Sequence, residues 1–83
     1  MSETIRVKLH AQAVELAGER EARIPVGAGS TGTDVKRALA DRFPRLAGLL
    51  SSSVLATDSE YLLDEATVAG AQRLHLIPPV SGG

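Results

Sequence analysis

Hydrophobic and polar positions alternate strictly near the start of the chain. Residues 4–10 have a repeat of two, which is typical of a strand with one buried face. The apolar face holds Ile5, Val7 and Leu9, and the polar face holds Arg6, Lys8 and His10. The pattern therefore predicts a strand whose outer side carries charge.

The next stretch has the composition of a short helix followed by a second strand. Residues 11–17 favour one or two helical turns, and Gly18 is a suitable residue to end them. Residues 21–26 alternate again, with Ala22, Ile24 and Val26 expected on the buried face. Because Pro25 has no N–H to donate, we expect this strand at an edge of the sheet.

The main helix is predicted after the loop at residues 27–30. Thr31 is a suitable N-cap, and Asp34 stands at the third helical position, where a carboxylate interacts favourably with the helix dipole. Pro44 should end the helix. The expected buried stripe comprises Val35, Ala38, Leu39 and Phe43, whereas Lys36, Arg37 and Asp41 lie off it and favour a solvated face.

Shorter elements follow. The leucines of residues 45–53 predict a helical turn that covers the core. Residues 54–57 and 60–63 read as two strands joined by a turn, and residues 64–71 as a connection anchored by Val68. The last strand is expected at residues 73–77, with Leu74 and Leu76 pointing inward.

This order of elements predicts an α+β domain in which one main helix packs across one face of a mixed sheet. The other face would then be uncovered, and an uncovered face in a small domain suits docking to another protein. The residues expected there are Arg6, Lys8, His10, Arg73, His75 and Ile77, and we add Tyr61 as an extension of the same docking face.

Composition narrows the classes of function. The 83 residues suffice for one small core, with 43% hydrophobic and 23% charged residues. A net charge of −1 and the scarcity of aromatic side chains, Phe43 and Tyr61, argue against nucleic-acid binding. The absence of cysteine excludes disulfides, thiolate metal sites and a cysteine nucleophile. No membrane span or signal peptide is recognisable, so we expect no membrane partner and a cytoplasmic location.

The chain ends in Pro78-Pro79-Val80-Ser81-Gly82-Gly83. The two prolines favour extended backbone, and the glycines have no Cβ to obstruct a narrow channel. Fully extended, six residues reach about 20 Å. We therefore expect a domain at residues 1–77 and a flexible tail at residues 78–83 that presents the Gly83 carboxylate. A carboxylate is a poor electrophile, so useful chemistry there would begin with adenylation.

Two segments resemble the MoaD/ThiS family of ubiquitin-like sulfur carriers. One is the terminal run from Ile77 to Gly83, and the other is the stretch from Ala11 to Gly18 after the first strand. Within the family, the chain is most similar to the small subunits of molybdopterin synthase. The resemblance implies the β-grasp fold.

The resemblance also implies a carrier that is not an enzyme on its own. An adenylyltransferase related to ubiquitin-activating enzymes (MoeB-like) would use ATP to adenylate Gly83, and a sulfur donor protein would convert it to a thiocarboxylate. The tail, comprising Pro78, Pro79, Val80, Ser81 and Gly82, would then thread into the synthase large subunit (MoaE-like). There the sulfur would pass to cyclic pyranopterin monophosphate in molybdenum cofactor biosynthesis. No permanently bound cofactor and no metal are expected.

The sequence departs from the family at several positions. The family often has an aromatic residue where His10 and Ile77 stand, an arginine at Val14, and Gly-Asp-Glu where Ala71-Gln72-Arg73 stands. These departures concern the docking face and leave the terminal glycines unaffected. Other open functions are sulfur delivery for thiazole, tRNA thiolation or cysteine synthesis, a ubiquitin-like modifier joined to lysines through Gly83, and an interaction module with an inert tail.

The sequence signals for a metal site or a phosphate-binding loop are weak. His10 and His75 are expected on adjacent strands, but two imidazoles without a third ligand favour partner contacts over a metal site. The segment Gly27-Ala28-Gly29 precedes a helix but lacks the Lys-Ser/Thr of a phosphate-binding loop.

Overall fold

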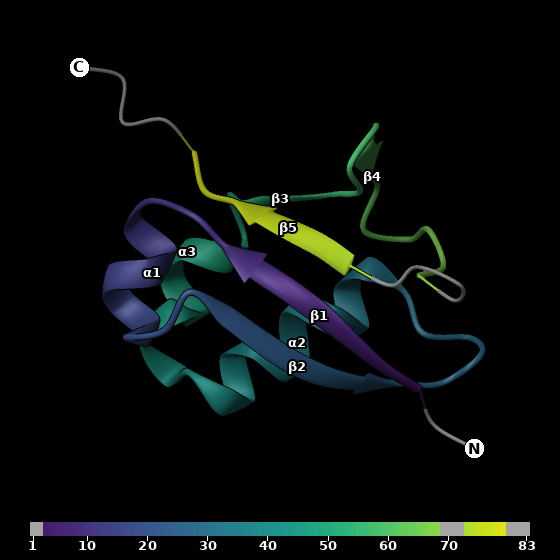
Figure 1. Cartoon of the computed structure of the whole chain (residues 1–83), viewed down its shortest axis with the longest axis horizontal. Coiled ribbons are helices and arrows are strands. Elements are labelled where there is room, and N and C mark those ends of the chain that lie inside the picture. The colour runs from purple at the N-terminus through teal and green to yellow at the C-terminus, as the bar shows by residue number, and fades with distance from the viewer. Residues whose placement is uncertain (1–2, 69–72, 80–83) are drawn as a thin grey trace.

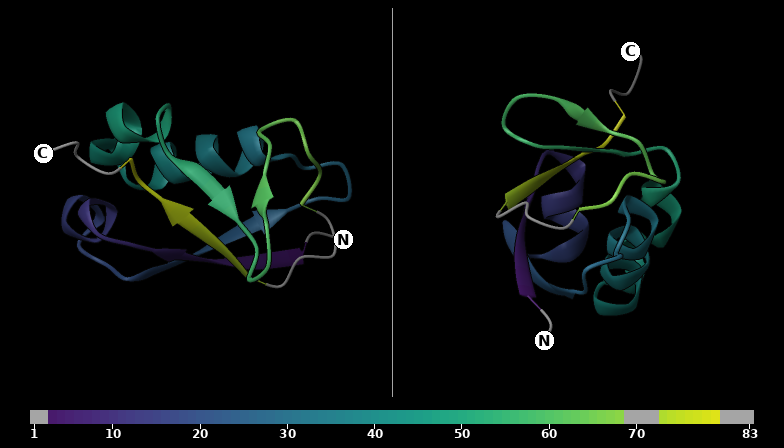
Figure 2. Two further views of the ribbon diagram at one scale, coloured as in Figure 1. Left: turned by 90° about the horizontal axis from the view of Figure 1, so that it is seen from above. Right: turned by 90° about the vertical axis from the view of Figure 1, so that its right-hand side faces the viewer.

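The computed structural model describes residues 3–68 and 73–79. Five strands form one sheet in the order β2-β1-β5-β3-β4. The long helix α2 (Gly32–Arg42) lies across one face of this sheet, as the two views in Figure 2 show. This mixed sheet with a single main helix confirms the predicted α+β, β-grasp architecture.

The first two strands form an antiparallel hairpin around a short helix (Figure 1). Strand β1 (Glu3–Leu9) and strand β2 (Glu21–Val26) are linked through α1 (Gln12–Ala17). Gly18 ends α1 with φ 76°, the left-handed geometry that favours glycine. Strand β2 is an edge strand, which tolerates the missing N–H of Pro25 and confirms that prediction.

The last strand occupies the centre of the sheet. Strand β5 (Arg73–Ile77) pairs in parallel with β1 and antiparallel with β3 (Val54–Ala56). Strand β3 in turn pairs with the short edge strand β4 (Tyr61–Leu62). Because β1 and β5 are parallel, their C-terminal ends lie at the same edge of the sheet.

An aliphatic core fills the space between the sheet and the helices. The predicted inward residues of the strands form it together with Val35 and Leu39 of α2, whereas Ala38 and Phe43 are half-buried against it. Leu39 and Leu76 are both 0% exposed. A 3-10 turn at Pro44–Leu46 and helix α3 (Ala47–Leu50) close one end with Leu46 and Leu50, which confirms the predicted cap over the core.

A capping box begins helix α2. The backbone N–H of Thr31 donates to the Asp34 carboxylate at 2.9 Å, and the Asp34 N–H donates to the Thr31 hydroxyl at 3.4 Å. This confirms Thr31 as the N-cap. Backbone hydrogen bonds also connect this end of the helix to residues 64–68, in which Val68 is buried as predicted.

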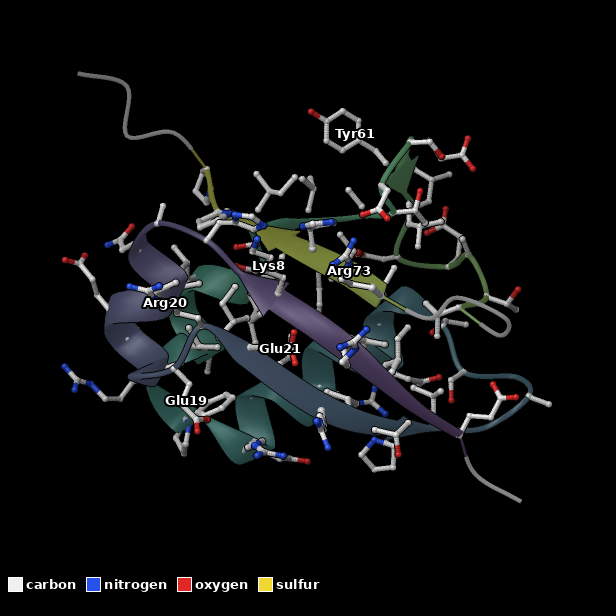
Figure 3. All side chains as sticks on the ribbon, viewed as in Figure 1. Lys8, Glu19, Arg20, Glu21, Tyr61 and Arg73 are labelled. Atoms are coloured by element: carbon white, nitrogen blue, oxygen red, sulfur yellow. The ribbon has the colours of Figure 1, made fainter. Side chains whose placement is uncertain are left out.

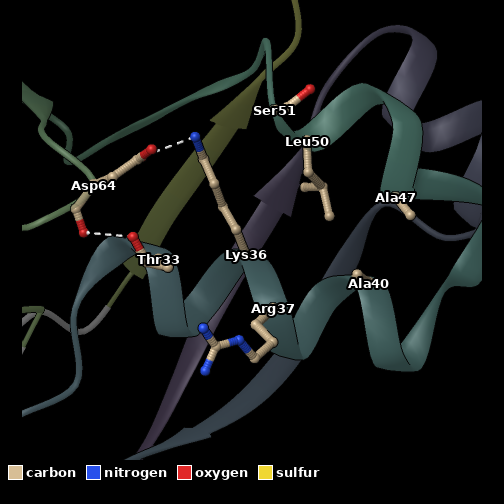
Figure 4. A pocket seen from close by; sticks show the side chains of 8 residues that line it. All are labelled: Thr33, Lys36, Arg37, Ala40, Ala47, Leu50, Ser51 and Asp64. Carbon is tan, nitrogen blue, oxygen red and sulfur yellow. Dashed lines mark hydrogen bonds and ion pairs between the residues drawn. The ribbon is translucent and has the colours of Figure 1, made fainter.

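Lys36 is an exception to the predicted solvated face of α2. Its side chain is only 12% exposed, and its Nζ lies 2.8 Å from the Asp64 carboxylate and donates to the Ser53 carbonyl at 2.7 Å (Figure 4). Thr33 donates to the Asp64 carbonyl at 3.2 Å in the same view. The expectation of a solvated Lys36 is therefore wrong, because two separate segments, at Ser53 and at Asp64, converge on its ammonium group.

Candidate docking face and tail exit

The C-terminal segment leaves the body at the end of β5. Pro78 is buried and Pro79 is exposed, so Pro78 packs with the domain although it was expected in the tail. The remaining predicted tail and reactive residues, Val80, Ser81, Gly82 and Gly83, lie outside the described residues. The described residues therefore show that the segment starts at the end of β5, between the two strands that flank it, β1 and β3.

The predicted docking face is brought together on the side of the sheet away from α2. Lys8 lies beside His75 in the parallel pair, and Arg6 lies beside Arg73. Their side chains project from the same face, and Figure 3 labels Lys8, Arg73 and Tyr61 on it. The residues of this outer face from the prediction are Arg6, Lys8, His10, Tyr61, Arg73, His75 and Ile77.

An apolar patch lies on the same face beside the end of β5. Its members are Val54, Tyr61 and Ile77, and we call them the apolar patch. Val54 is 43% exposed beside Ile77, and Tyr61 is 74% exposed at the edge strand. A hollow of about 320 Å³ lies between Tyr61 and Ile77. Such an exposed apolar surface, ringed by polar side chains, is typical of a protein contact.

Sequence reasoning missed two contributors to this face. Val54 was read only as the start of a strand, and its outward direction follows from its pairing with Ile77. Asp58, read as a turn residue, accepts from His75 at 2.8 Å and from Arg73 at 3.3 Å. Its position in the turn between two strands was visible in the sequence, but its two partners depend on the sheet order.

The two histidines form a hydrogen-bonded chain with Asp58. Nε2 of His10 lies 2.9 Å from Nδ1 of His75, whose Nε2 lies 2.8 Å from the Asp58 carboxylate. Because a carboxylate only accepts, Nε2 of His75 carries the proton, and Nδ1 of a neutral His75 accepts from Nε2–H of His10. The pair therefore keeps this geometry when both rings are neutral.

The surroundings disfavour a charge on His10. Burial lowers the pKa of His10 below its usual value, and the nearby His75 and Lys8 lower it further. The hydrogen bonds from His75 and Arg73 lower the pKa of the Asp58 carboxyl. Within the described residues, no group of three or more His, Cys, Asp or Glu side chains is placed to hold a metal ion.

We predict that stability decreases as the pH falls below 6.5. The unfolded chain binds a proton at His10 near that pH, whereas the folded chain resists it until a lower pH, so acid favours unfolding. Urea unfolding at pH 7 and pH 5 should show the lower free energy of unfolding at pH 5. The His10→Gln variant should reduce the difference, and an unchanged difference in this variant would contradict the assignment to His10.

Among residues 3–68 and 73–79, no helix has the length and apolar character that crossing a membrane requires.

Comparison with known proteins agrees with the family resemblance of the sequence. The ThiS family model matches residues 7–83. A molybdopterin synthase sulfur carrier subunit from Arabidopsis thaliana is 39% identical over 79 residues, covering 95% of this chain and 82% of the relative. Small archaeal modifier protein 1 of Haloferax volcanii is 36% identical over 85 residues, covering 92% of this chain and 97% of the relative.

Solved structures share the fold. The crystal structure of small archaeal modifier protein 1 from Haloferax volcanii matches with a TM-score of 0.85 and 28% identity, covering 98% of this chain and 100% of that one. A putative molybdopterin converting factor subunit 1 from Pyrococcus furiosus matches with a TM-score of 0.79 and 20% identity, covering 93% and 98%. With a family model that spans nearly its whole length, the chain belongs to the ThiS/MoaD family of ubiquitin-like β-grasp proteins.

Proposed function

We propose that this chain is the sulfur carrier subunit of a molybdopterin synthase. The observation that carries the proposal is the 39% identity to a relative of that name over 95% of the chain, combined with a Gly82-Gly83 terminus. The structure is compatible with this role, since the segment before the glycines starts at an exposed residue, Pro79, at the edge of an uncovered sheet face.

The proposed chemistry takes place at the Gly83 carboxylate. A MoeB-like adenylyltransferase joins this carboxylate to AMP from ATP and releases pyrophosphate. The terminal sulfur of a persulfide on a donor protein then displaces AMP and forms an acyl disulfide. A thiol reduces its S–S bond and releases the thiocarboxylate. In a MoaE-like large subunit this sulfur is passed to cyclic pyranopterin monophosphate, and water restores the Gly83 carboxylate. Because ATP drives the first step, the proposal places the chain in the cytoplasm.

In this scheme the chain delivers sulfur to the large subunit. Its carboxyl end supplies the acyl group, Gly82 lets the backbone pass where a side chain would not, and the sheet face gives each partner a surface to hold. The ATP site and the pterin site belong to the partners, so the chain is no enzyme on its own in this scheme.

Intact-mass measurement tests the first half of the proposal. After incubation with the activating enzyme, ATP and a sulfur donor, the mass should rise by the difference between one sulfur and one oxygen atom. A chain that lacks Gly83 is the matched control and should keep its mass. An unmodified full-length chain in the presence of active enzyme would overturn the proposal.

Reconstitution with the large subunit tests the second half. The thiocarboxylate form should convert cyclic pyranopterin monophosphate to molybdopterin, whereas the carboxylate form should not. A thiocarboxylate that supports no conversion, but does support thiazole, thiouridine or cysteine formation with the corresponding partners, would move the chain to another sulfur pathway.

A ubiquitin-like modifier is the second candidate, favoured by the 36% identity to small archaeal modifier protein 1. The same acyl adenylate would then react with a lysine amine of a target protein, forming an amide and releasing AMP. Conjugates of higher mass that carry the Gly82-Gly83 remnant on lysine would support this role, and their absence from cells that express the tagged chain would exclude it.

A further inference from the structure

The chain has two lysines among its nine basic residues, Lys8 and Lys36. The other basic residues are arginines, whose guanidinium groups stay protonated and do not act as nucleophiles at neutral pH. A lysine amine that has lost its proton attacks an activated carboxyl group and forms an amide. The side chains of this protein therefore offer two positions at which an acyl group can be attached through an amide bond.

The structure protects Lys36 from such a reaction. Its Nζ lies 2.8 Å from the Asp64 carboxylate and donates to the Ser53 carbonyl at 2.7 Å, and its side chain is 12% exposed. An acyl group on this nitrogen would remove the charge that pairs with Asp64, and the nitrogen would have to leave both partners before it could react. Lys36 is therefore a poor acceptor while the domain is folded.

The surroundings of Lys8 are the opposite. Its side chain is exposed on the outer face of β1, beside His75 of β5 and opposite Glu21 of β2 (Figure 3). Within residues 3–68 and 73–79, no carboxylate lies at ion-pair distance from its Nζ. The amine of Lys8 can therefore meet an acyl group that arrives from solvent.

Three exposed arginines lie two positions along the strands from Lys8. The register places Arg6 of β1 between Arg23 of β2 and Arg73 of β5, all on the outer face. Like charges opposite one another destabilise a sheet, and in the described part of the chain only Arg73 of the three has a carboxylate at ion-pair distance, that of Asp58. An anionic leaving group, such as the phosphate of an acyl adenylate, would be attracted to this place beside the amine.

The carboxyl end of a second copy fits this position. Its last six residues carry no charged side chain, so they would add no repulsion near the arginines. Within one copy, β5 runs parallel to β1 and passes the level of Lys8 at His75, so the chain leaves the sheet beyond it. The end of the same copy would have to reverse direction after two prolines that favour extended backbone, whereas a second copy approaches from solvent.

We propose that Lys8 is a modification site at which the Gly83 carboxyl end of a second copy of this chain is joined through an amide bond. The Lys8 ammonium gives one proton to water, and the neutral amine attacks the carbonyl carbon of the Gly83 adenylate. The C–N bond forms, the bond between the carbonyl carbon and the phosphate oxygen breaks, AMP leaves with the electron pair, and the nitrogen gives a second proton to water. The inference rests on the proposed function for the activation of Gly83.

A thioester at Gly83 tests the acceptor without any enzyme. The donor is the full chain with a mercaptoethanesulfonate thioester, whose sulfonate stands in for the adenylate phosphate, and the acceptor is the isotope-labelled unaltered chain. Peptide mapping by mass spectrometry should find Gly83 joined to Lys8 at least about tenfold more often than to Lys36. In denaturing urea the two lysines should react equally to within about twofold, because the contacts that protect Lys36 are lost.

The Lys8→Arg variant of the acceptor keeps the charge and removes the nucleophile. The yield of joined chains should fall at least about tenfold, whereas the matched control, Lys36→Arg, should leave it within about twofold. Arg6→Gln removes the central positive charge and should lower the yield about threefold at low NaCl and less at high NaCl. Thermal unfolding checks that the three variants fold.

The activating enzyme from the same genome tests the reaction in its proposed setting. With ATP and no sulfur donor, chains joined at Lys8 should form, and addition of the donor should reduce their yield, because both reactions consume the same adenylate. A failure to activate Gly83 would overturn the proposed function, and the thioester reaction would still decide the acceptor.

Three results would overturn the inference. The first is a thioester that joins mainly the N-terminal amine or Lys36 of the folded acceptor. The second is a thioester that closes on Lys8 of its own copy, which gives a monomer that has lost the thiol and no joined chains. The third is an activating enzyme that releases AMP in the presence of the chain and ATP while no joined chains appear.

Discussion

Replacing Gly82 by valine is expected to lower synthase activity by at least about a hundredfold, because a branched side chain would hold the reacting carboxyl end away from its position in a narrow channel. The fold should be unaffected, since the change lies beyond Pro79 at the end of the described body. The measurement is molybdopterin formation by the reconstituted synthase, with circular dichroism and thermal unfolding as the test of folding.

Gly29→Val provides the matched control for this substitution. Gly29 lies in the loop before α2, and a Cβ there would meet no atom within 4 Å. The same gain of a branched side chain on the body should therefore leave synthase activity near that of the unaltered chain. Full activity of the Gly82→Val variant would show that the partners do not enclose the tail closely.

Replacing Leu39 by alanine is expected to lower the free energy of unfolding by about 3 kcal/mol. Leu39 is 0% exposed and lies on the side of α2 that packs against the sheet, so its loss leaves a cavity between the two layers. For a domain of this size the Tm should fall by roughly 10 °C or more. Urea unfolding and thermal unfolding measure the two quantities.

The control for Leu39 is another leucine of the same domain. Leu63 is 70% exposed, so Leu63→Ala removes the same atoms from a side chain that already contacts water. Its effect should stay within about 0.5 kcal/mol. Equal losses in the two variants would contradict the assignment of the core to the space between α2 and the sheet.

The strands and the main helix could be predicted because their signals are local. The alternation of Ile5, Val7 and Leu9 fixes which face of β1 is buried, and Thr31 with Asp34 marks the start of α2 within four consecutive residues. These features depend on neighbours in the sequence, so they are readable before any tertiary contact is known.

The missed features depend on pairs distant in the sequence. Lys36 was expected in water, because nothing near it in the chain shows that Asp64 and the Ser53 carbonyl approach its ammonium group. The adjacency of three arginines could not be predicted for a similar reason: Arg23, Arg6 and Arg73 become neighbours only through the register of three strands. The hydrogen bond between Asp58 and His75 was missed for the same reason, because it depends on the pairing of distant strands.

The placement of these residues on one face of the sheet was predicted in part because they belong to strands with clear alternation; the docking role stays a prediction. His10 and His75 were expected near each other on adjacent strands, and they lie within hydrogen-bond distance. Their chemistry required more than the pattern, since the tautomer of each ring depends on Asp58 at the far end of the chain of hydrogen bonds.

The central position of β5 has a mechanical consequence. Hydrogen bonds to β1 and β3 run across the strand on both sides, so a pull on the chain beyond Pro79 acts along the strand and loads both ladders together. A terminal strand at an edge would instead peel away one bond after another. The body should therefore withstand a larger force on its carboxyl end than a domain whose last strand lies at an edge.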